Sequence, residues 1–221
     1  MSSRDRILGR VRRALAGVPH DDTPYEQAVP RGYQRRHGER NAAETVDLLA
    51  ENLVDYRAVV HRCDAAGLPA LIAHLLGERD STGVLVPPGL DEAWLSATAV
   101  QQVADRADAT PGELDRVDSV VTGCAVAIAE TGTIVLDGSP DQGRRRVTLV
   151  PDHHICVVRV PEQVVSSVPE ALERLTPAHP LTWISGPSAT SDIELDRVEG
   201  VHGPRCLEVV LVSGARPARL A

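Results

Sequence analysis

Residues 125–136 constrain the fold most strongly. Two short apolar runs flank a polar turn formed by Glu130, Thr131, Gly132 and Thr133. The runs contain small and β-branched residues, which is typical of strands that are buried on both faces. Four residues with a glycine between two such runs predict a tight turn. Burying a carboxylate and two hydroxyls beside buried strands costs free energy unless these groups are hydrogen-bonded or have a function. The turn is therefore either a polar hairpin tip or part of a functional site.

From residue 57 onward, short apolar runs alternate with amphipathic segments. The expected strands are 58–60, 83–86, 99–103, 147–150, 155–160, 181–184 and 207–212, and the expected helices are 68–76, 91–95, 113–121 and 164–175. A further helix begins at Asn41, where Glu44 three residues later completes a capping-box pattern. This alternation predicts an α/β fold with an open, mostly parallel sheet that has helices on both faces.

The first 40 residues differ from the rest of the chain in charge and in residue composition. They hold nine arginines against five acidic residues, whereas the remaining 181 residues hold fourteen arginines against twenty-six acidic residues. Residues 4–15 place apolar side chains on one face at helical spacing, and residues 16–40 are rich in proline, glycine and charge. We therefore expect a basic amphipathic helix and linker over 1–40 and an α/β domain over 41–221. The helix would dock on a partner, an anionic membrane or an acidic protein surface, or fold back on its own acidic core.

Composition excludes several classes of protein. The net charge of -8 argues against nucleic acid as a partner. Lysine is absent, which rules out a Schiff-base lysine and a P-loop. The four cysteines are each more than 30 residues from the next, so iron–sulfur and zinc-ribbon spacings are absent and no cofactor is expected in this chain. No apolar stretch reaches the roughly 20 residues of a membrane span, and no secretory signal is visible, so we expect a cytoplasmic protein.

The loop after the predicted strand 181–184 carries polar groups that could bind a ligand. Gly186 permits a sharp turn, and Ser188, Thr190 and Asp192 follow it. Loops at the carboxyl ends of parallel strands are where open α/β sheets bind ligands. Ser188 stands in a broken nucleophile-elbow pattern, because Thr190 occupies the place of the required glycine, so a serine hydrolase is disfavoured. A network of polar turns that only orders the loop remains the alternative.

Three further stretches could contribute chemistry. His202 lies in a compact loop before the last strand, where its ring could shuttle protons or stabilise the loop. Arg144 and the two arginines after it could clamp an anion or form a solvated flank. His153 and His154 are adjacent in a predicted strand and so point to opposite faces. They cannot easily share one ion, and no metal site is expected.

Four stretches of the sequence resemble motifs of the LUD-domain family, in its lactate utilization protein C branch. They are residues 127–133, Gly186-Pro187-Ser188 with Thr190, residues 192–194 and residues 200–204. The resemblance covers roughly 41–212. It implies a fold similar to the ribose-phosphate isomerase, glucosamine-phosphate deaminase and CoA-transferase group. It also implies a role in a three-protein system that oxidises L-lactate to pyruvate, with the iron–sulfur clusters in partner proteins.

Two functions are consistent with this resemblance. The chain is either an accessory subunit of a lactate-oxidising complex, or a stand-alone enzyme or small-anion binder that handles a sugar phosphate or an acyl-CoA ester. Whether the chain is an enzyme stays open. The candidate site combines the turn residues Thr131, Gly132 and Thr133 with Gly186, Pro187, Ser188, Thr190, Asp192 and Arg144, and we expect these segments to meet in one pocket. Glu130 and His202 are the candidate catalytic residues, and Glu130 is expected mainly to orient the turn.

Overall fold

The computed structural model describes residues 2–18, 23–29, 32, 34–190, 198–199 and 203–214. The chain divides into two compact units, residues 1–34 and 35–221. The first unit contains α1 (Ser3–Leu15) and the short α2 (Tyr25–Ala28). Ser2 caps α1 through a reciprocal pair of hydrogen bonds with Asp5, and α1 buries none of its residues. The expected amphipathic helix is therefore present.

The second unit is a mixed α/β domain. Its helices are α3 (Ala42–Asp55), α4 (Leu68–Glu78), α5 (Pro111–Leu114) and α6 (Val168–Arg174). Its strands are β1 (Val59–Asp64), β2 (Gly83–Val86), β3 (Gln101–Ala104), β4 (Ser119–Thr122), β5 (Val126–Ile128), β6 (Thr133–Leu136), β7 (His153–Val160), β8 (Val164–Val165), β9 (Thr182–Ile184), β10 (Ala189–Thr190), β11 (Val198–Glu199) and β12 (Cys206–Ser213). Asn41 caps α3 with Glu44 in the predicted capping box.

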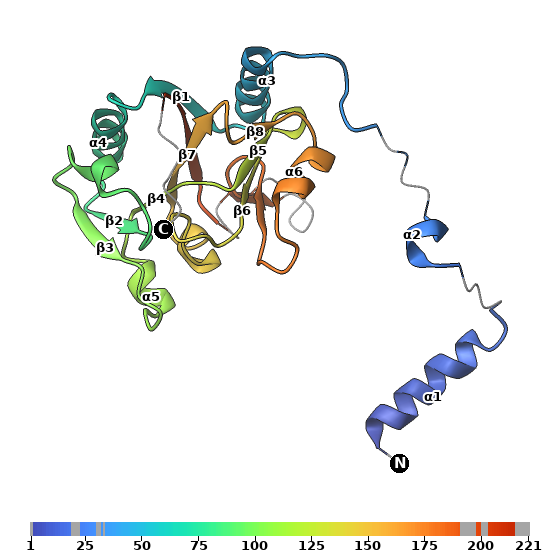
Figure 1. Ribbon diagram of the computed structural model, residues 1–221. Coiled ribbons are helices and arrows are strands. Elements are labelled where there is room, and N and C mark those ends of the chain that lie inside the picture. The colour runs from blue at the N-terminus through green and yellow to red at the C-terminus, as the bar shows by residue number, and fades with distance from the viewer. Residues whose placement is uncertain are drawn as a thin grey trace. The chain divides into compact units, whose positions relative to one another are not determined.

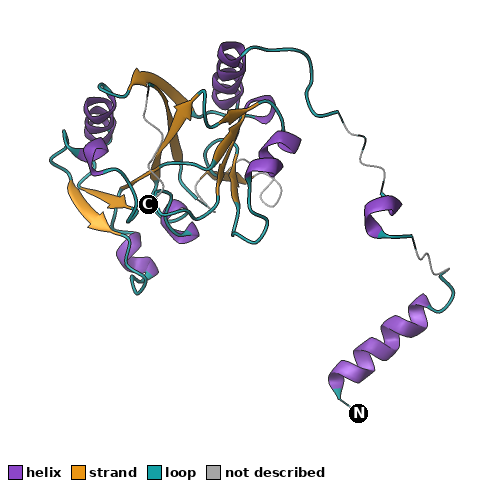
Figure 2. Ribbon diagram, in the orientation of Figure 1, coloured by secondary structure: helices purple, strands orange, loops and turns teal. Residues whose placement is uncertain are grey.

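A six-stranded sheet forms the centre of the domain, in the order β1-β12-β7-β4-β2-β3 (Figures 1 and 2). All five neighbouring pairs are parallel. The strands β7 and β12 are neighbouring interior strands of this sheet, and six of the eight residues in each are buried. The open parallel sheet expected from the sequence is thus confirmed.

A second sheet holds the hairpin that the sequence singled out. Its order is β8-β5-β6-β9, with β5 and β6 antiparallel and every residue of both strands buried. The turn between them is a 3₁₀ segment, Ala129–Thr131, closed by Gly132 in the left-handed conformation at φ 54°. The hairpin therefore forms as predicted, but it belongs to a smaller sheet and does not extend the parallel one.

The layers are held together by separate apolar clusters. The helix α4 packs on one face of the six-stranded sheet, against alternate residues of β7 and β12 such as Ile155 and Val210. On the other face α3 and the hairpin pack against Cys156, Val158 and Val209. The far side of the small sheet is covered by α6. Helices thus flank the parallel sheet, and the small sheet joins α3 on one of its faces.

Three expected elements are wrong. The predicted helix 113–121 is only a short turn, α5, followed by strand β4, because the β-branched residues after Asp118 pair with β2 and β7. The predicted strand 147–150 is a 3₁₀ turn, Arg145–Thr148, which buries Val147. The predicted helix 164–175 begins only at Val168, because residues 164–165 pair with β5 as strand β8 and Ser167 caps the helix, whose first turn holds Pro169.

In the described part of the chain, no helix combines the length and the apolar character that crossing a bilayer would require.

Candidate functional site

The hairpin tip packs against the last turns of α3. A Cβ atom on Gly132 would lie 2.8 Å from the backbone carbon of Asn52, so the position needs glycine for space as well as for its positive φ. The Asn52 side chain donates a hydrogen bond to the Ala129 carbonyl at 2.7 Å. These contacts explain the glycine in the Glu-Thr-Gly motif as a packing requirement.

The carboxylate of Glu130 is occupied by groups that precede α3. One oxygen accepts a hydrogen bond from the backbone amide of His37 at 3.0 Å, and the other lies 2.8 Å from the ring Nδ1 of His37. The guanidinium of Arg40 lies 3.6 Å from the first oxygen. Glu130 thus links the segment before α3 to the hairpin tip, and these contacts orient that segment.

The second glycine motif approaches the same end of α3. Gly186 has φ 82°, and a Cβ atom there would lie 2.2 Å from the carbonyl oxygen of Tyr56. The hydroxyls of Ser185 and Thr133 are hydrogen-bonded at 2.8 Å, which joins this turn to the hairpin. Both motifs are therefore assembled around the carboxyl end of α3.

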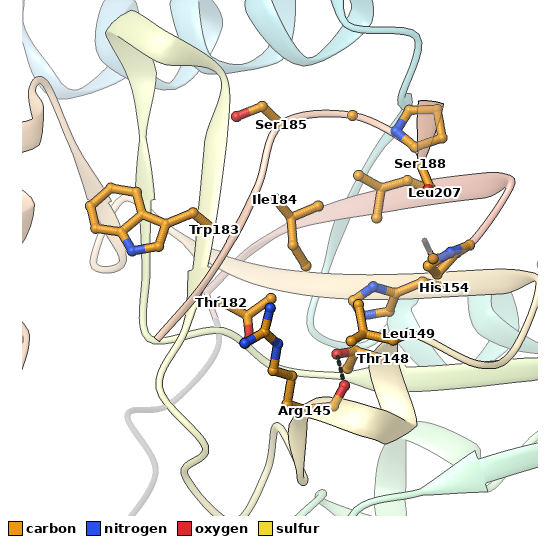
Figure 3. A pocket seen from close by; sticks show the side chains of 14 residues that line it. Arg145, Thr148, Leu149, His154, Thr182, Trp183, Ile184, Ser185, Ser188 and Leu207 are labelled. Carbon is orange, nitrogen blue, oxygen red and sulfur yellow. Dashed lines mark hydrogen bonds between the residues drawn. The ribbon is translucent and has the colours of Figure 1, made fainter. Parts of the chain in front are cut away.

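A cavity of about 360 Å³ opens on the other side of the Gly186 turn. It is formed by the 3₁₀ turn Arg145–Thr148, the start of β7, β9, the turn that follows β9, and the start of β12 (Figure 3). Its lining comprises Arg145, Thr148, Leu149, His154, Thr182, Trp183, Ile184, Ser185, Gly186, Pro187, Ser188, Gly203, Pro204 and Leu207. This volume falls in the range typical of small-ligand sites.

Arg145 gives the cavity its charge. Its side chain extends beside Thr182 in Figure 3, and the described lining contains no carboxylate. Within the described parts of the chain no acidic residue forms an ion pair with Arg145, whereas Arg144 donates to both carboxylate oxygens of Asp105 and Arg146 donates to the carbonyls of residues 106 and 107. Of the three consecutive arginines, Arg145 is thus the one placed to hold an anion.

His154 forms part of the cavity wall as a neutral ring. Its Nε2 lies 2.8 Å from the Thr122 hydroxyl, and the residue is 1% exposed. Burial, together with the neighbouring His153, lowers the pKa of His154 to about 3. The imidazole therefore contributes hydrogen bonding without charge near neutral pH.

The structure distributes the predicted site residues over two hollows. Gly186, Pro187 and Ser188 line the cavity beside Arg145. Glu130 and Thr131 line a separate hollow with Asn52, Asp55 and Tyr56. Thr133 bridges the two regions through Ser185, and Arg144 lies outside both, in its ion pair with Asp105. The predicted site residues that the structure describes thus line separate hollows, where one pocket was expected.

The remaining predicted residues fall at or beyond the edge of the described chain. Thr190 lies in β10, which pairs with β11, and its backbone alone is described. Asp192 and His202 lie outside the described residues. Sequence reasoning missed Arg145 and His154 as lining residues. The sequence offers three consecutive arginines, but only the fold shows that Arg145 is the one that lines this cavity.

The motifs and the fold match a known family. Residues 46–212 match the LUD domain. The chain belongs to the LUD domain family. A relative in this family, lactate utilization protein C of Deinococcus radiodurans, is 44% identical over 93% of each chain. The protein of the same name from Halalkalibacterium halodurans is 29% identical over 89% of each chain, and that of Bacillus subtilis is 26% identical over 78% of this chain and 80% of the relative.

A solved structure supports the same assignment. The crystal structure of a DUF162 family protein from Deinococcus radiodurans superposes with a TM-score of 0.68 at 42% sequence identity, and the match covers 79% of this chain and 99% of that chain. The α/β architecture described above is therefore that of the LUD domain family.

Proposed function

We propose that this protein acts in lactate utilization, as a component of the system that oxidises L-lactate to pyruvate. The observation that carries the proposal is the 44% identity, over 93% of both chains, with a protein named lactate utilization protein C. Two more distant relatives bear the same name. The proposed setting is the cytoplasm, with which four free thiols are consistent.

In this proposal the redox chemistry belongs to iron–sulfur partner proteins. The four cysteines of this chain are scattered, and two of them, Cys124 and Cys156, are fully buried in the core. The neighbouring Cys156 thiol and burial raise the pKa of Cys124, which disfavours the thiolate that a cluster needs. This chain would then serve as an accessory subunit that assembles with the partners.

The cavity beside Arg145 favours a second candidate, in which the chain binds or converts a small anion itself. A guanidinium, several hydroxyls and a neutral imidazole, with no carboxylate in the described lining, suit a carboxylate or a phosphate. The volume exceeds what a three-carbon acid fills, so a larger anion such as a sugar phosphate or part of an acyl-CoA ester would suit it better. Such ligands are handled by the CoA-transferase-like proteins whose fold the motifs resemble.

A deletion experiment tests the main proposal. The gene is removed from its own organism, and growth is measured on L-lactate and on pyruvate as sole carbon source. The proposal expects growth to fail on L-lactate alone and to return when the gene is restored. Undiminished growth on L-lactate would contradict it.

A purification experiment separates the two candidates. The tagged full-length chain is isolated anaerobically from lactate-grown cells, and iron, acid-labile sulfide and bound proteins are measured. An accessory subunit should bring down cysteine-rich iron–sulfur partners, while the chain purified alone should hold no cluster. A lone active chain that converts an anion without partners would support the second candidate instead.

A further inference from the structure

A cluster of three possible metal ligands lies on the α4 face of the six-stranded sheet, away from the cavity. His153 and Cys206 are the first residues of β7 and β12 and are register partners. Glu208 stands two residues after Cys206 and so faces the same way. The nitrogen, sulfur and oxygen donor atoms of these three side chains all lie within 4.8 Å of one another.

His153 directs an unsatisfied nitrogen toward this cluster. The residue is 4% exposed, and its Nδ1 lies 2.9 Å from the Ser119 hydroxyl, which is itself 2.7 Å from Ser81 Oγ. Its buried Nε2 has no hydrogen-bond partner among the described residues, although it lies 3.3 Å from a carboxylate oxygen of Glu208. A buried polar atom without a partner is costly and calls for an explanation. In metal-binding histidines a hydrogen bond to the other ring nitrogen orients the imidazole, and the Ser119 hydroxyl is placed to make that bond here.

Glu208 and Cys206 complete the donor set. Glu208 is 3% exposed, and one of its oxygens lies 2.7 Å from Nε2 of His61, which leaves the other oxygen facing His153. Arg79, which follows α4, supplies the compensating charge. Its Nη2 lies 2.7 Å from Cys206 Sγ and its Nε lies 3.6 Å from Glu208 Oε1. The Arg79 side chain is 46% exposed, so it can leave the cluster for solvent while the domain stays folded.

We propose that His153 Nε2, Cys206 Sγ and the Glu208 carboxylate bind a divalent metal ion of the zinc type in exchange for the Arg79 guanidinium. Imidazole, thiolate and carboxylate are the ligand types that zinc takes in proteins. A dication balances the thiolate and the carboxylate, which leaves the buried site neutral. Three protein ligands leave a fourth position for water.

The distances suit this exchange. Donor atoms around a tetrahedral zinc ion lie about 3.5 Å apart, given bond lengths of about 2.0–2.3 Å. The His153 and Glu208 donors are already 3.3 Å apart. The sequence does not reveal this site, because His153 is far from Cys206 and Glu208 along the chain. The adjacent His153 and His154 do point to opposite faces, toward Ser119 and Thr122 respectively, and the missing ligands come from β12, some 50 residues later.

Cobalt titration of the full-length chain tests the proposal. Co²⁺ replaces Zn²⁺ in such sites, and a Co²⁺–thiolate bond gives a near-ultraviolet charge-transfer band. We expect one Co²⁺ per chain with this band, displaced by Zn²⁺. Cys206→Ser should abolish the band, and His153→Gln should weaken binding at least about tenfold. Cys63→Ser is the matched control, because Cys63 is also half-buried but lies outside the cluster.

Arg79→Gln removes the competing cation and should tighten Co²⁺ binding about tenfold or more. Circular dichroism checks that every variant is folded. If His153→Gln is unfolded, the result for Cys206→Ser alone tests whether the metal binds at this cluster. A band that survives in Cys206→Ser would place the metal elsewhere and overturn the proposal. Absence of the band in the native chain would also overturn it. If the band then appeared in Arg79→Gln, Arg79 would be the permanent cation of this cluster.

Discussion

The carboxylate of Glu130 holds His37 by two contacts, at 3.0 Å to its backbone amide and 2.8 Å to its ring, across 93 positions of sequence. This pair ties the segment that precedes α3 to the tip of the buried hairpin. Glu130 is 15% exposed at its side chain, whereas the His37 side chain is 67% exposed, so solvent weakens the electrostatic part of the contact.

Replacing Glu130 by Gln should therefore loosen residues 35–40 without unfolding the domain. We expect a loss of about 0.5–1 kcal/mol in the free energy of unfolding and faster amide exchange confined to that segment. Hydrogen exchange followed by mass spectrometry measures this, with Glu162→Gln at an exposed position as the control. Unchanged exchange at residues 35–40 would mean that Glu130 does not orient them.

Two truncations should separate the N-terminal unit from the segment that follows it. Removing residues 1–34 takes away only the first unit, so the thermal midpoint of the domain should stay the same. Removing residues 1–40 also deletes the ion pair of Arg36 with Glu170 and the contacts of His37 with Glu130. The midpoint should then fall by about 2–4 °C for each kcal/mol lost. Equal midpoints for the two truncations would show that residues 35–40 add no stability.

The two motif glycines should tolerate no side chain. Gly186→Ala would bring a Cβ atom to 2.2 Å from the Tyr56 carbonyl at a φ of 82°. We expect a loss of more than about 2 kcal/mol in urea unfolding. Gly77→Ala is the opposite case, because Gly77 lies in α4 with open space around it, and it should gain about 0.5–1 kcal/mol. A harmless Gly186→Ala would contradict the packing described here.

His154 should make the protein sensitive to acid. Its pKa in the folded state, lowered to about 3, lies below the value of about 6.5 in an unfolded chain. The unfolded state therefore binds a proton first, and stability that is fully present above about pH 6.5 is lost as the pH falls toward 3. His154→Gln should reduce the difference in unfolding free energy between about pH 7.5 and about pH 5 by about 2 kcal/mol. The exposed His74→Gln should leave this difference unchanged, and an unchanged difference in His154→Gln would refute the assignment.

Arg145 should carry the anion affinity of the cavity. Arg145→Gln is expected to weaken binding of a phosphate-bearing ligand about tenfold, which corresponds to about 1.4 kcal/mol for one charge-assisted contact. Calorimetric titration with inorganic phosphate, and then with a sugar phosphate, measures it. Arg116→Gln, at an exposed position outside the cavity, serves as the control. Equal affinities for the two variants would remove Arg145 from the site.

The sequence predicted the parallel sheet because strands such as β7 and β12 contain apolar runs, residues 155–158 and 209–212. It failed where short segments depend on tertiary partners. Val147 and its neighbours read as a strand, but they form a turn because Val147 packs against Leu85 and Val120. The motif glycines could be recognised in the sequence. The reason why these positions require glycine could not, because it is the close approach of the α3 backbone. Arg145 and His154 could not be selected as lining residues either, because the side chains that border a cavity are set by neighbours far away in sequence.

The place of β12 in the central sheet has a consequence for biosynthesis. Strand β1 pairs only with β12 among the described strands of that sheet, with Val59 opposite Glu208. A nascent chain that has not yet reached residue 206 therefore exposes unpaired edges on both β1 and β7. Such edges invite pairing with other chains, and closing so long a loop is slow. The protein should depend on chaperones or on fast translation of its last strand, and aggregation during synthesis should outpace aggregation of the finished fold.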